Sequence, residues 1–240
     1  MNLIEALYQL KNDELKDLRK SELLKFIGTC FTHSDVSLSQ NFQDVFALFN
    51  VNFKRNGFFV EFGATDGITG SNSYILENNY GWSGILAEPN PVWHESLAKN
   101  RRCGISNKCV FIASDQTVDF TTTDDPALST IKGFGLDDEF KDVRKNAPSV
   151  KVQTISLVDL LDEYYSPEVI DYLSIDTEGT EYGILNAFFQ QNTKYKIRAL
   201  TVEHNFTPIR DKLHALLASN GYVRKFTEIS RWDDFFVKEI

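Results

Sequence analysis

Short apolar segments alternate with helical segments along most of the chain from Gly57 onward. The apolar segments end in glycine, proline or acidic residues, and most are followed by a stretch with helical spacing of its apolar residues. Parallel strands need such crossovers, so the sequence predicts an α/β fold with a doubly wound, Rossmann-like sheet. The expected strands are FFVEFGA, GWSGILAEPN, CVFIAS, VQTIS, DYLSIDTEGTE and IRALTVEHN.

The two ends of the chain depart from this alternation. The last two expected strands, YVRKFTEIS and WDDFFVKEI, are separated only by a short turn, which predicts a hairpin and one antiparallel strand in the sheet. Residues 1–50 form an expected N-terminal helical segment, in which Ser39 can cap the helix of SQNFQDVFALFN, and residues 51–240 form the main domain. Within it, residues 124–150 mix glycine, proline and charge, which predicts an insertion beside the substrate.

Composition argues against several classes of protein. A chain of 240 residues with 42% hydrophobic residues can build a full core, and a net charge of -9 argues against an electrostatic grip on nucleic acid. No apolar stretch is long enough to span a bilayer, and the acidic N-terminus does not resemble a signal peptide, so we expect a cytoplasmic protein. The three cysteines, Cys30, Cys103 and Cys109, have neither disulfide-framework nor zinc-site spacing.

The loop after the first strand is the first candidate ligand site, because open α/β sheets bind ligands at the carboxyl ends of their strands. It has no lysine near its glycines, as a P-loop would, and its glycine spacing is looser than G-x-G-x-x-G. Its acids would also repel a pyrophosphate. The residues of this loop that we expect to face a ligand are Glu61, Gly63, Ala64, Asp66 and Gly67.

S-adenosylmethionine suits this loop better than a phosphate ligand does. The acids can hold its ammonium group, and the glycines let the backbone approach it closely. Backbone N–H groups near Ser71, Asn72 and Ser73 can bind its carboxylate. The sequence therefore favours a ligand with a positive centre.

Later strand ends add polar groups to the predicted site. Glu88, followed by Pro89, ends the second strand and can accept hydrogen bonds from ribose hydroxyls, a contact that S-adenosylmethionine and NAD share. Ser114 and Asp115 follow the third expected strand and can meet an adenine amino group, although a turn accounts for Asp115 without any ligand.

The segments VEFGATDGITGSNS, LAEPNP, FIASD, YLSIDTEGTE and LTVEHN, in this order and spacing, resemble the FkbM-type methyltransferases. The resemblance runs from about residue 39 to the C-terminus. It implies a seven-stranded class I methyltransferase sheet, S-adenosyl-L-methionine as cofactor, and methyl transfer to a hydroxyl oxygen, often of a sugar or polyketide. SQNFQD also resembles a family element, so Gln43 is a candidate to close over the cofactor, and a surface helix accounts for it equally well.

Methyl transfer to a hydroxyl needs a base or a metal ion to remove the proton. His204 is the candidate base, because histidine is the side chain whose unperturbed pKa lies near working pH, and a structural histidine is an equal alternative. Asp176 is expected beside the methionine part of the cofactor, and Glu178 or Glu203 can orient His204 or bind the acceptor. The alternative is a Mg²⁺ site formed by Asp176, Glu203 and Asn205.

The leading hypothesis is an S-adenosylmethionine-dependent O-methyltransferase. Its expected acceptor is a hydroxyl of a small molecule, either a carbohydrate or a related glycan or natural product, and its expected partners include no nucleic acid. The alternatives are an NAD-dependent oxidoreductase on a similar sheet and a non-catalytic binding module of the same fold.

Overall fold

The computed structural model describes residues 18–240 and divides the chain into two units, residues 1–37 and 38–240. The described helix of the first unit is α2 (Leu18–His33). The prediction of helix for residues 1–17 lies outside the described residues. The second unit begins before residue 51, because α3 (Gln43–Asn50) contacts β8, β9 and β11 of the main sheet.

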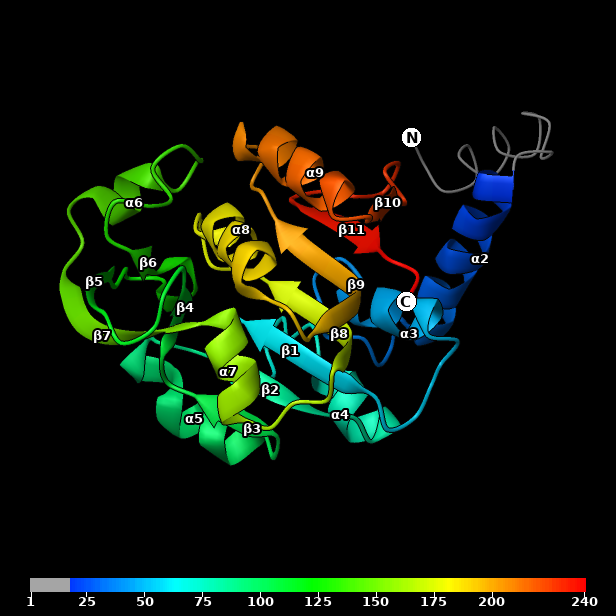
Figure 1. Cartoon of the computed structure of the whole chain (residues 1–240), viewed down its shortest axis with the longest axis horizontal. Coiled ribbons are helices and arrows are strands. Elements are labelled where there is room, and N and C mark those ends of the chain that lie inside the picture. Colours follow the sequence, from blue (N-terminus) through cyan, green and yellow to red (C-terminus); the bar gives the residue numbers. More distant parts are fainter. Residues whose placement is uncertain (1–17) are drawn as a thin grey trace. The chain divides into compact units, whose positions relative to one another are not determined.

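A seven-stranded sheet in the order β10-β11-β9-β8-β1-β2-β3 forms the centre of the second unit (Figure 1). Strand β11 pairs antiparallel with both of its neighbours, β9 and β10, and every other pairing in this sheet is parallel. The predicted fold class, with its antiparallel terminal strand, is therefore confirmed. The strands are β1 (Phe58–Phe62), β2 (Ser83–Ala87), β3 (Gly104–Ser106), β8 (Val169–Ile175), β9 (Lys196–Glu203), β10 (Val223–Lys225) and β11 (Asp233–Val237).

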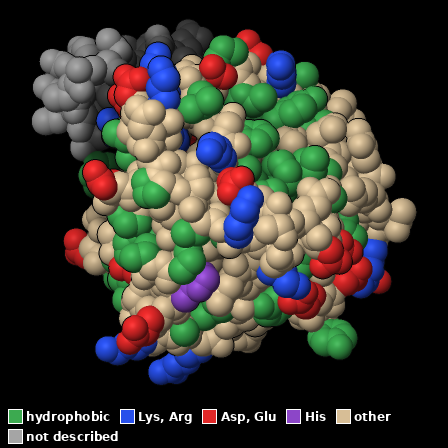
Figure 2. Space-filling model, turned by 90° about the vertical axis from the view of Figure 1, so that its left-hand side faces the viewer, with side chains coloured by type: hydrophobic (Ala, Val, Ile, Leu, Met, Phe, Trp, Pro, Cys, Tyr) green, Lys and Arg blue, Asp and Glu red, His purple; other side chains and the backbone are tan. Residues whose placement is uncertain are grey.

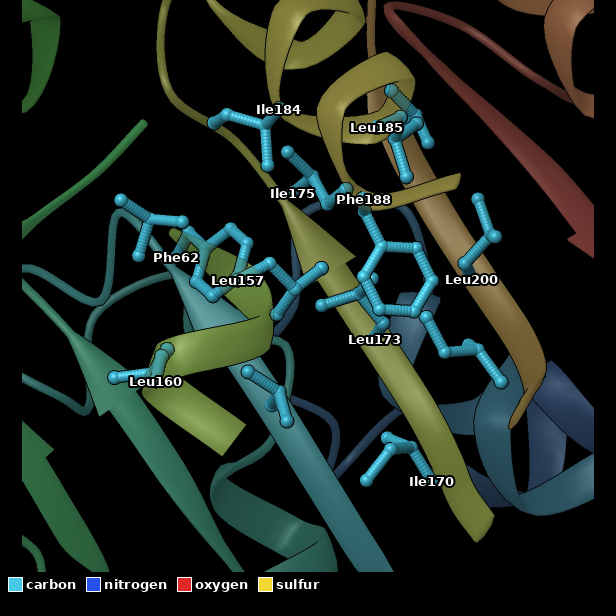
Figure 3. Close-up of a cluster of buried hydrophobic side chains, with 14 of the residues drawn as sticks. Phe62, Leu157, Leu160, Ile170, Leu173, Ile175, Ile184, Leu185, Phe188 and Leu200 are labelled. Carbon is cyan, nitrogen blue, oxygen red and sulfur yellow. The ribbon is translucent and has the colours of Figure 1, made fainter. Parts of the chain in front are cut away.

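Helices connect the parallel strands and bury both faces of the sheet, which is why its strands are almost continuously apolar. Phe62, Leu173 and Leu200 from three strands pack with Leu157 of α7 and Phe188 of α8 (Figure 3). The connecting helices are α4 (Tyr74–Tyr80), α5 (His94–Asn100), α7 (Leu157–Glu163), α8 (Glu181–Gln191) and α9 (Ile209–Ser219), and a 3-10 turn, η1 (Pro91–Trp93), precedes α5. No helix within the described part of the chain is long and apolar enough to cross a membrane.

A second sheet of four strands, in the order β4-β7-β5-β6, corrects two strand assignments. CVFIAS and VQTIS were expected in the central sheet, but the strand beside β2 is β3, and β4 in CVFIAS pairs with β7, which includes VQTIS. An apolar run shows that a strand is buried but not which sheet it joins. The elements of this four-stranded lobe are β4 (Cys109–Phe111), β5 (Thr117–Thr121), η2 (Pro126–Leu128), β6 (Thr130–Ile131), α6 (Lys141–Lys145) and β7 (Ser149–Ser156).

The start of α3 differs from the prediction that Ser39 caps it. Phe42 holds the N-cap position in the left-handed conformation and makes no side-chain cap bond. The Ser39 hydroxyl donates to Asp44 at 2.7 Å, and the backbone of Ser39 pairs with Gly70. Ser39 therefore joins the segment before α3 to the loop after β1.

Candidate functional site

A cavity of about 1050 Å³ lies at the carboxyl ends of β1, β2, β8 and β9. Residues of the four-stranded lobe, from β4 to Phe140, supply another part of its wall. Figure 2 views the side of the molecule where α6, β5 and β7 are drawn in Figure 1, and basic and acidic side chains are interspersed across that face. The cavity is the place where the strand ends and the insertion meet, as the sequence predicts for a ligand site in an open sheet.

At Gly63 the backbone that follows β1 lies close to the backbone that follows β8. The φ of Gly63 is +73°, and a Cβ added there would lie 2.1 Å from the carbonyl oxygen of Asp176. Only glycine combines that backbone conformation with that contact. Gly63 therefore lets the loop after β1 lie directly against the end of β8.

The carboxylate of Glu61 is engaged by its own loop. It accepts hydrogen bonds from the Asn72 N–H at 2.8 Å, from the Ser71 hydroxyl at 3.1 Å and from the Ser73 hydroxyl. Burial raises the pKa of Glu61, while the nearby Arg101 guanidinium and these hydrogen bonds lower it. Glu61, the acid expected to hold the ammonium group, thus contacts Ser71, Asn72 and Ser73, which were expected near the carboxylate of the cofactor. These hydrogen bonds stabilise the conformation of the loop.

Asp66 and Arg101 also stabilise this loop, Asp66 from within it and Arg101 from the end of α5. Asp66 accepts from the Ile68 and Thr69 N–H groups and from the Thr69 hydroxyl; burial alone would raise its pKa, but these bonds hold it below the usual value. Arg101 is buried and donates to Glu77, Ser71, Ser73 and the Gly67 carbonyl. Nothing in the linear sequence relates Arg101 to this loop, which is 30 residues away.

Glu88 lines the cavity at the end of β2 and joins two loops. Its carboxylate accepts from the Thr65 N–H at 2.9 Å and from the Asn90 N–H at 2.8 Å. Burial raises the pKa of Glu88 to about 7, although both hydrogen bonds oppose this rise. The predicted ribose-binding acid is thus at the cavity wall, with its position set by backbone donors.

The raised pKa of Glu88 predicts a pH dependence of stability. The unfolded chain releases this proton near pH 4.5 and the folded chain near pH 7, so the folded state binds more protons between these values. The free energy of unfolding should therefore fall as the pH rises from 4.5 to 7, with Glu88 contributing on the order of 3 kcal/mol. Urea unfolding at a series of pH values checks this, with Glu88→Gln expected to flatten the profile. An equally steep profile in Glu88→Gln would assign the dependence to other acids, among them Glu178 and Asp233, whose pKa values burial also raises to about 7.

Apolar side chains form another part of the cavity wall. It was not predicted from the sequence, because most of it belongs to the four-stranded lobe. The indole N–H of Trp93 has no hydrogen-bond partner in residues 18–240. The side chains of this apolar wall include Trp93, Cys109, Val110, Phe120 and Ile131.

Five predicted cofactor residues are not among the residues that line the cavity: Gly67, Ser73, Gln43, Ser114 and Asp115. Ser114 donates to Asp159 and accepts from the Ser156 N–H, and Asp115 has a φ of 60° in the turn between β4 and β5. The Gln43 amide donates to Asp233 at 2.8 Å and so ties α3 to β11, whereas Gln40 lines the cavity. Their roles at a cofactor stay predictions, and each has a structural role in this fold.

Three acids from the ends of β8 and β9 meet at the cavity wall. Ile175 pairs with Val202, so the residues that follow them, Asp176 and Glu203, lie side by side. One carboxylate oxygen each of Asp176, Glu178 and Glu203 lies within 4.8 Å of the others. Burial and the neighbouring negative charges raise the pKa values of Asp176 and Glu203 well above the usual range.

Glu178 differs from the other two acids because it has a cationic partner. Arg144 donates to Glu178 and to Asp138, each at 2.5 Å, and so connects the lobe to the loop after β8. The Asn205 amide also donates to Glu178, at 3.2 Å. The carboxylate oxygens that lie close enough together to bind one cation are therefore those of Asp176, Glu178 and Glu203. The predicted Mg²⁺ site at Asp176, Glu203 and Asn205 stays a prediction.

His204 is buried beside the large cavity but does not line it. Its Nδ1 accepts from the Phe206 N–H at 3.0 Å, and its Nε2 lies 3.6 Å from Asp234 Oδ1. It lines a second cavity of about 160 Å³, which shares Glu203 and Asn205 with the large one. The general-base role of His204 stays a prediction, and its contacts are those of a residue that positions the loop after β9.

Comparison with family models gave a match that covers most of the chain. The model of the methyltransferase FkbM domain matches residues 61–235. Similar solved structures include a precorrin-6y C5,15-methyltransferase from Geobacter metallireducens, with 12% identity, 81% of this chain and 85% of that chain covered, and a TM-score of 0.41. A TehB-like SAM-dependent methyltransferase from Corynebacterium glutamicum has 7% identity over 91% of this chain and 99% of that chain, with a TM-score of 0.40.

A human methyltransferase 10 domain containing protein has 12% identity over 92% of this chain and 97% of that chain, with a TM-score of 0.39. Because all three TM-scores lie below 0.5, no function is inferred from these structures. Comparison with curated proteins gave no match at the significance threshold.

Proposed function

The chain belongs to the FkbM methyltransferase family, and from this premise we propose that it methylates a hydroxyl oxygen of a carbohydrate or a related glycan or natural product. Membership of the family establishes methyl transfer in general and implies S-adenosylmethionine as the methyl donor. The observation that carries the finer proposal is the pair of the half-buried Asp176 and the buried Glu203 at the wall of the strand-end cavity. A carboxylate there suits the removal of a hydroxyl proton.

The cavity has the features that this donor requires. Its volume of about 1050 Å³ lies at the upper end of the range of small-molecule sites, and its apolar wall around Trp93 and Val110 can pack against an adenine ring. Glu88 offers carboxylate oxygens for ribose hydroxyls, and Gly63 lines the cavity beside it. When bound, S-adenosylmethionine supplies a methyl group on a positively charged sulfur.

The charge of the cavity wall disfavours a dinucleotide. Among the described residues that line it, every charged side chain is a carboxylate, and none is lysine, arginine or histidine. A pyrophosphate would face Glu61, Asp66 and Glu88 without a basic partner, and like charges repel. This supports the methyl donor over NAD as the ligand.

We assign the role of general base to the pair of Asp176 and Glu203. Two neighbouring carboxyl groups whose pKa values are both raised cannot both ionise easily, so they share a proton and the ionised member stays strongly basic. That member accepts the proton of an acceptor hydroxyl held at this end of the cavity. Proximity contributes as well, because the acceptor oxygen is then fixed at the wall where the loop after β1 meets the end of β8.

Calorimetry with S-adenosylhomocysteine tests the cofactor site. Glu88→Ala should weaken binding by about tenfold to a hundredfold, because it removes charge-assisted hydrogen bonds and leaves the Thr65 and Asn90 N–H groups unpaired. Glu95→Ala, which removes an exposed acid of α5 outside the cavity wall, should bind as the unmodified protein does. Equal affinity in all three proteins would place the cofactor elsewhere.

Two further measurements separate the alternatives for the whole protein. S-adenosylhomocysteine should raise the melting temperature and NADH should not, since only a ligand of the native state stabilises it. Formation of S-adenosylhomocysteine from S-adenosylmethionine with hydroxylated acceptors then distinguishes an enzyme from a binding module of the same fold. Binding without turnover on any acceptor would favour the binding module.

A further inference from the structure

An exposed phenylalanine in a strained turn lies at the wall of the cavity. Phe206 is 68% exposed, and both it and the preceding Asn205 have left-handed backbones, with φ values of 55° and 44°. A bulky residue seldom adopts this conformation, and such strain persists only where the surroundings impose it. Phe206 and Trp232 both line the large cavity.

Several hydrogen bonds impose this turn. The Phe206 N–H donates to His204 Nδ1 at 3.0 Å, and the N–H groups of His204 and Asn205 donate to the Trp232 carbonyl at 2.8 and 3.3 Å. The rings of His204 and Phe206 meet edge to face, with centroids 5.5 Å apart. These bonds hold the loop after β9 against Trp232, the residue before β11. Phe206 and Trp232 thus line the same cavity as the acids.

Among the described residues that line the cavity, none is a lysine, arginine or histidine, and Arg231, whose guanidinium lies 5.3 Å from the centroid of the Trp232 ring, is not a lining residue. Arg144 pairs with Glu178 but is itself buried, and its remaining N–H groups donate to Asp138, Gly135 and Leu128. From the lobe, Asp125 and Glu139 add exposed carboxylates to the wall. Protonation of buried acids can make this wall neutral, but it cannot make it positive.

We propose that the acceptor is a hydroxylated ring that has an apolar face and carries no phosphate or carboxylate. This inference rests on the proposed methyl transfer. The apolar C–H face of such a ring packs on Phe206 and Trp232, and its hydroxyl or amine groups donate to Asp176, Glu178 and Glu203. A phosphorylated or nucleotide-linked sugar would bring negative charge to a wall on which, within residues 18–240, every charged group is a carboxylate.

A matched panel of acceptors tests the charge preference. Each ring is supplied in three forms, such as glucose, glucosamine and glucose 6-phosphate, and S-adenosylhomocysteine formation is measured at constant ionic strength. We expect the neutral and amine forms to exceed the phosphate form at least tenfold in kcat/KM. A faster phosphate form on any ring overturns the inference, as does the absence of turnover on every ring while S-adenosylhomocysteine still binds. Failure of S-adenosylhomocysteine to bind would instead remove the proposed function itself.

Substitution of the exposed phenylalanine tests the stacking surface with the best acceptor of that panel. Phe206→Ala should raise the acceptor KM at least tenfold while the affinity for S-adenosylhomocysteine stays within twofold, and Phe206→Tyr should restore the KM. Tyr165→Ala is the matched control, because Tyr165 is also an exposed aromatic residue, 94% exposed with a φ of 49°, and lines neither cavity. An unchanged KM in Phe206→Ala, or an equal rise in Tyr165→Ala, overturns the assignment.

Discussion

Gly63→Ala should lower the free energy of unfolding by about 2 to 5 kcal/mol and abolish binding of S-adenosylhomocysteine. The new Cβ would lie 2.1 Å from the Asp176 carbonyl oxygen, and the residue would have to hold a φ of +73°. Relief of this clash requires the loop after β1 and the end of β8 to separate. Urea unfolding and calorimetry measure the two effects.

Gly70→Ala separates the clash from the backbone strain. Gly70 has nearly the same φ, +70°, but the nearest atom to an added Cβ is the Gln40 side chain at 3.7 Å, an ordinary contact. This variant should lose only about 1 to 2 kcal/mol, the cost of the left-handed conformation. If the two variants were equally stable, the close approach of β1 and β8 would not hold in solution.

Glu203→Gln should lower kcat by about a hundredfold to ten-thousandfold, the usual contribution of a general base, while S-adenosylhomocysteine still binds. In the unmodified enzyme, kcat should rise with pH through a range above the ordinary carboxyl pKa, because burial and Asp176 raise the pKa of Glu203 and only the ionised pair accepts a proton. The amide cannot titrate, so the part of this rise that belongs to Glu203 should be lost in the variant. Steady-state rates at a series of pH values measure both effects.

Glu181→Gln is the control for the loss of a buried acid in the same region. Glu181 is buried at the start of α8, where it accepts from the Thr177 and Gly179 N–H groups, and it does not line the large cavity. Its amide variant retains an oxygen acceptor and should keep the pH profile of kcat. A profile unchanged in Glu203→Gln, together with one lost in His204→Asn, would return the role of base to His204.

The alternation of apolar and helical segments was enough to predict the central sheet. Parallel strands place their carboxyl ends along one edge, so the positions of Glu88, Asp176 and Glu203 at strand ends already predicted that all three would meet one cavity. The antiparallel β11 followed from the short turn before it. These features depend on local periodicity and on chain direction, which a single sequence displays.

Tertiary structure decided which polar groups face the cavity. Glu61 and Asp66 are engaged by donors of their own loop, whereas Asp176 and Glu203 meet each other at the wall. The apolar wall includes Cys109 and Val110 of β4, which lies in the four-stranded lobe and not in the central sheet. Local pattern places a residue in a strand, helix or loop, but the partner of its side chain is set by packing between segments distant in the sequence. The sequence therefore determined the strand-end edge, and contacts such as those of Arg101 and Arg144 determined which acids at that edge are left for a ligand.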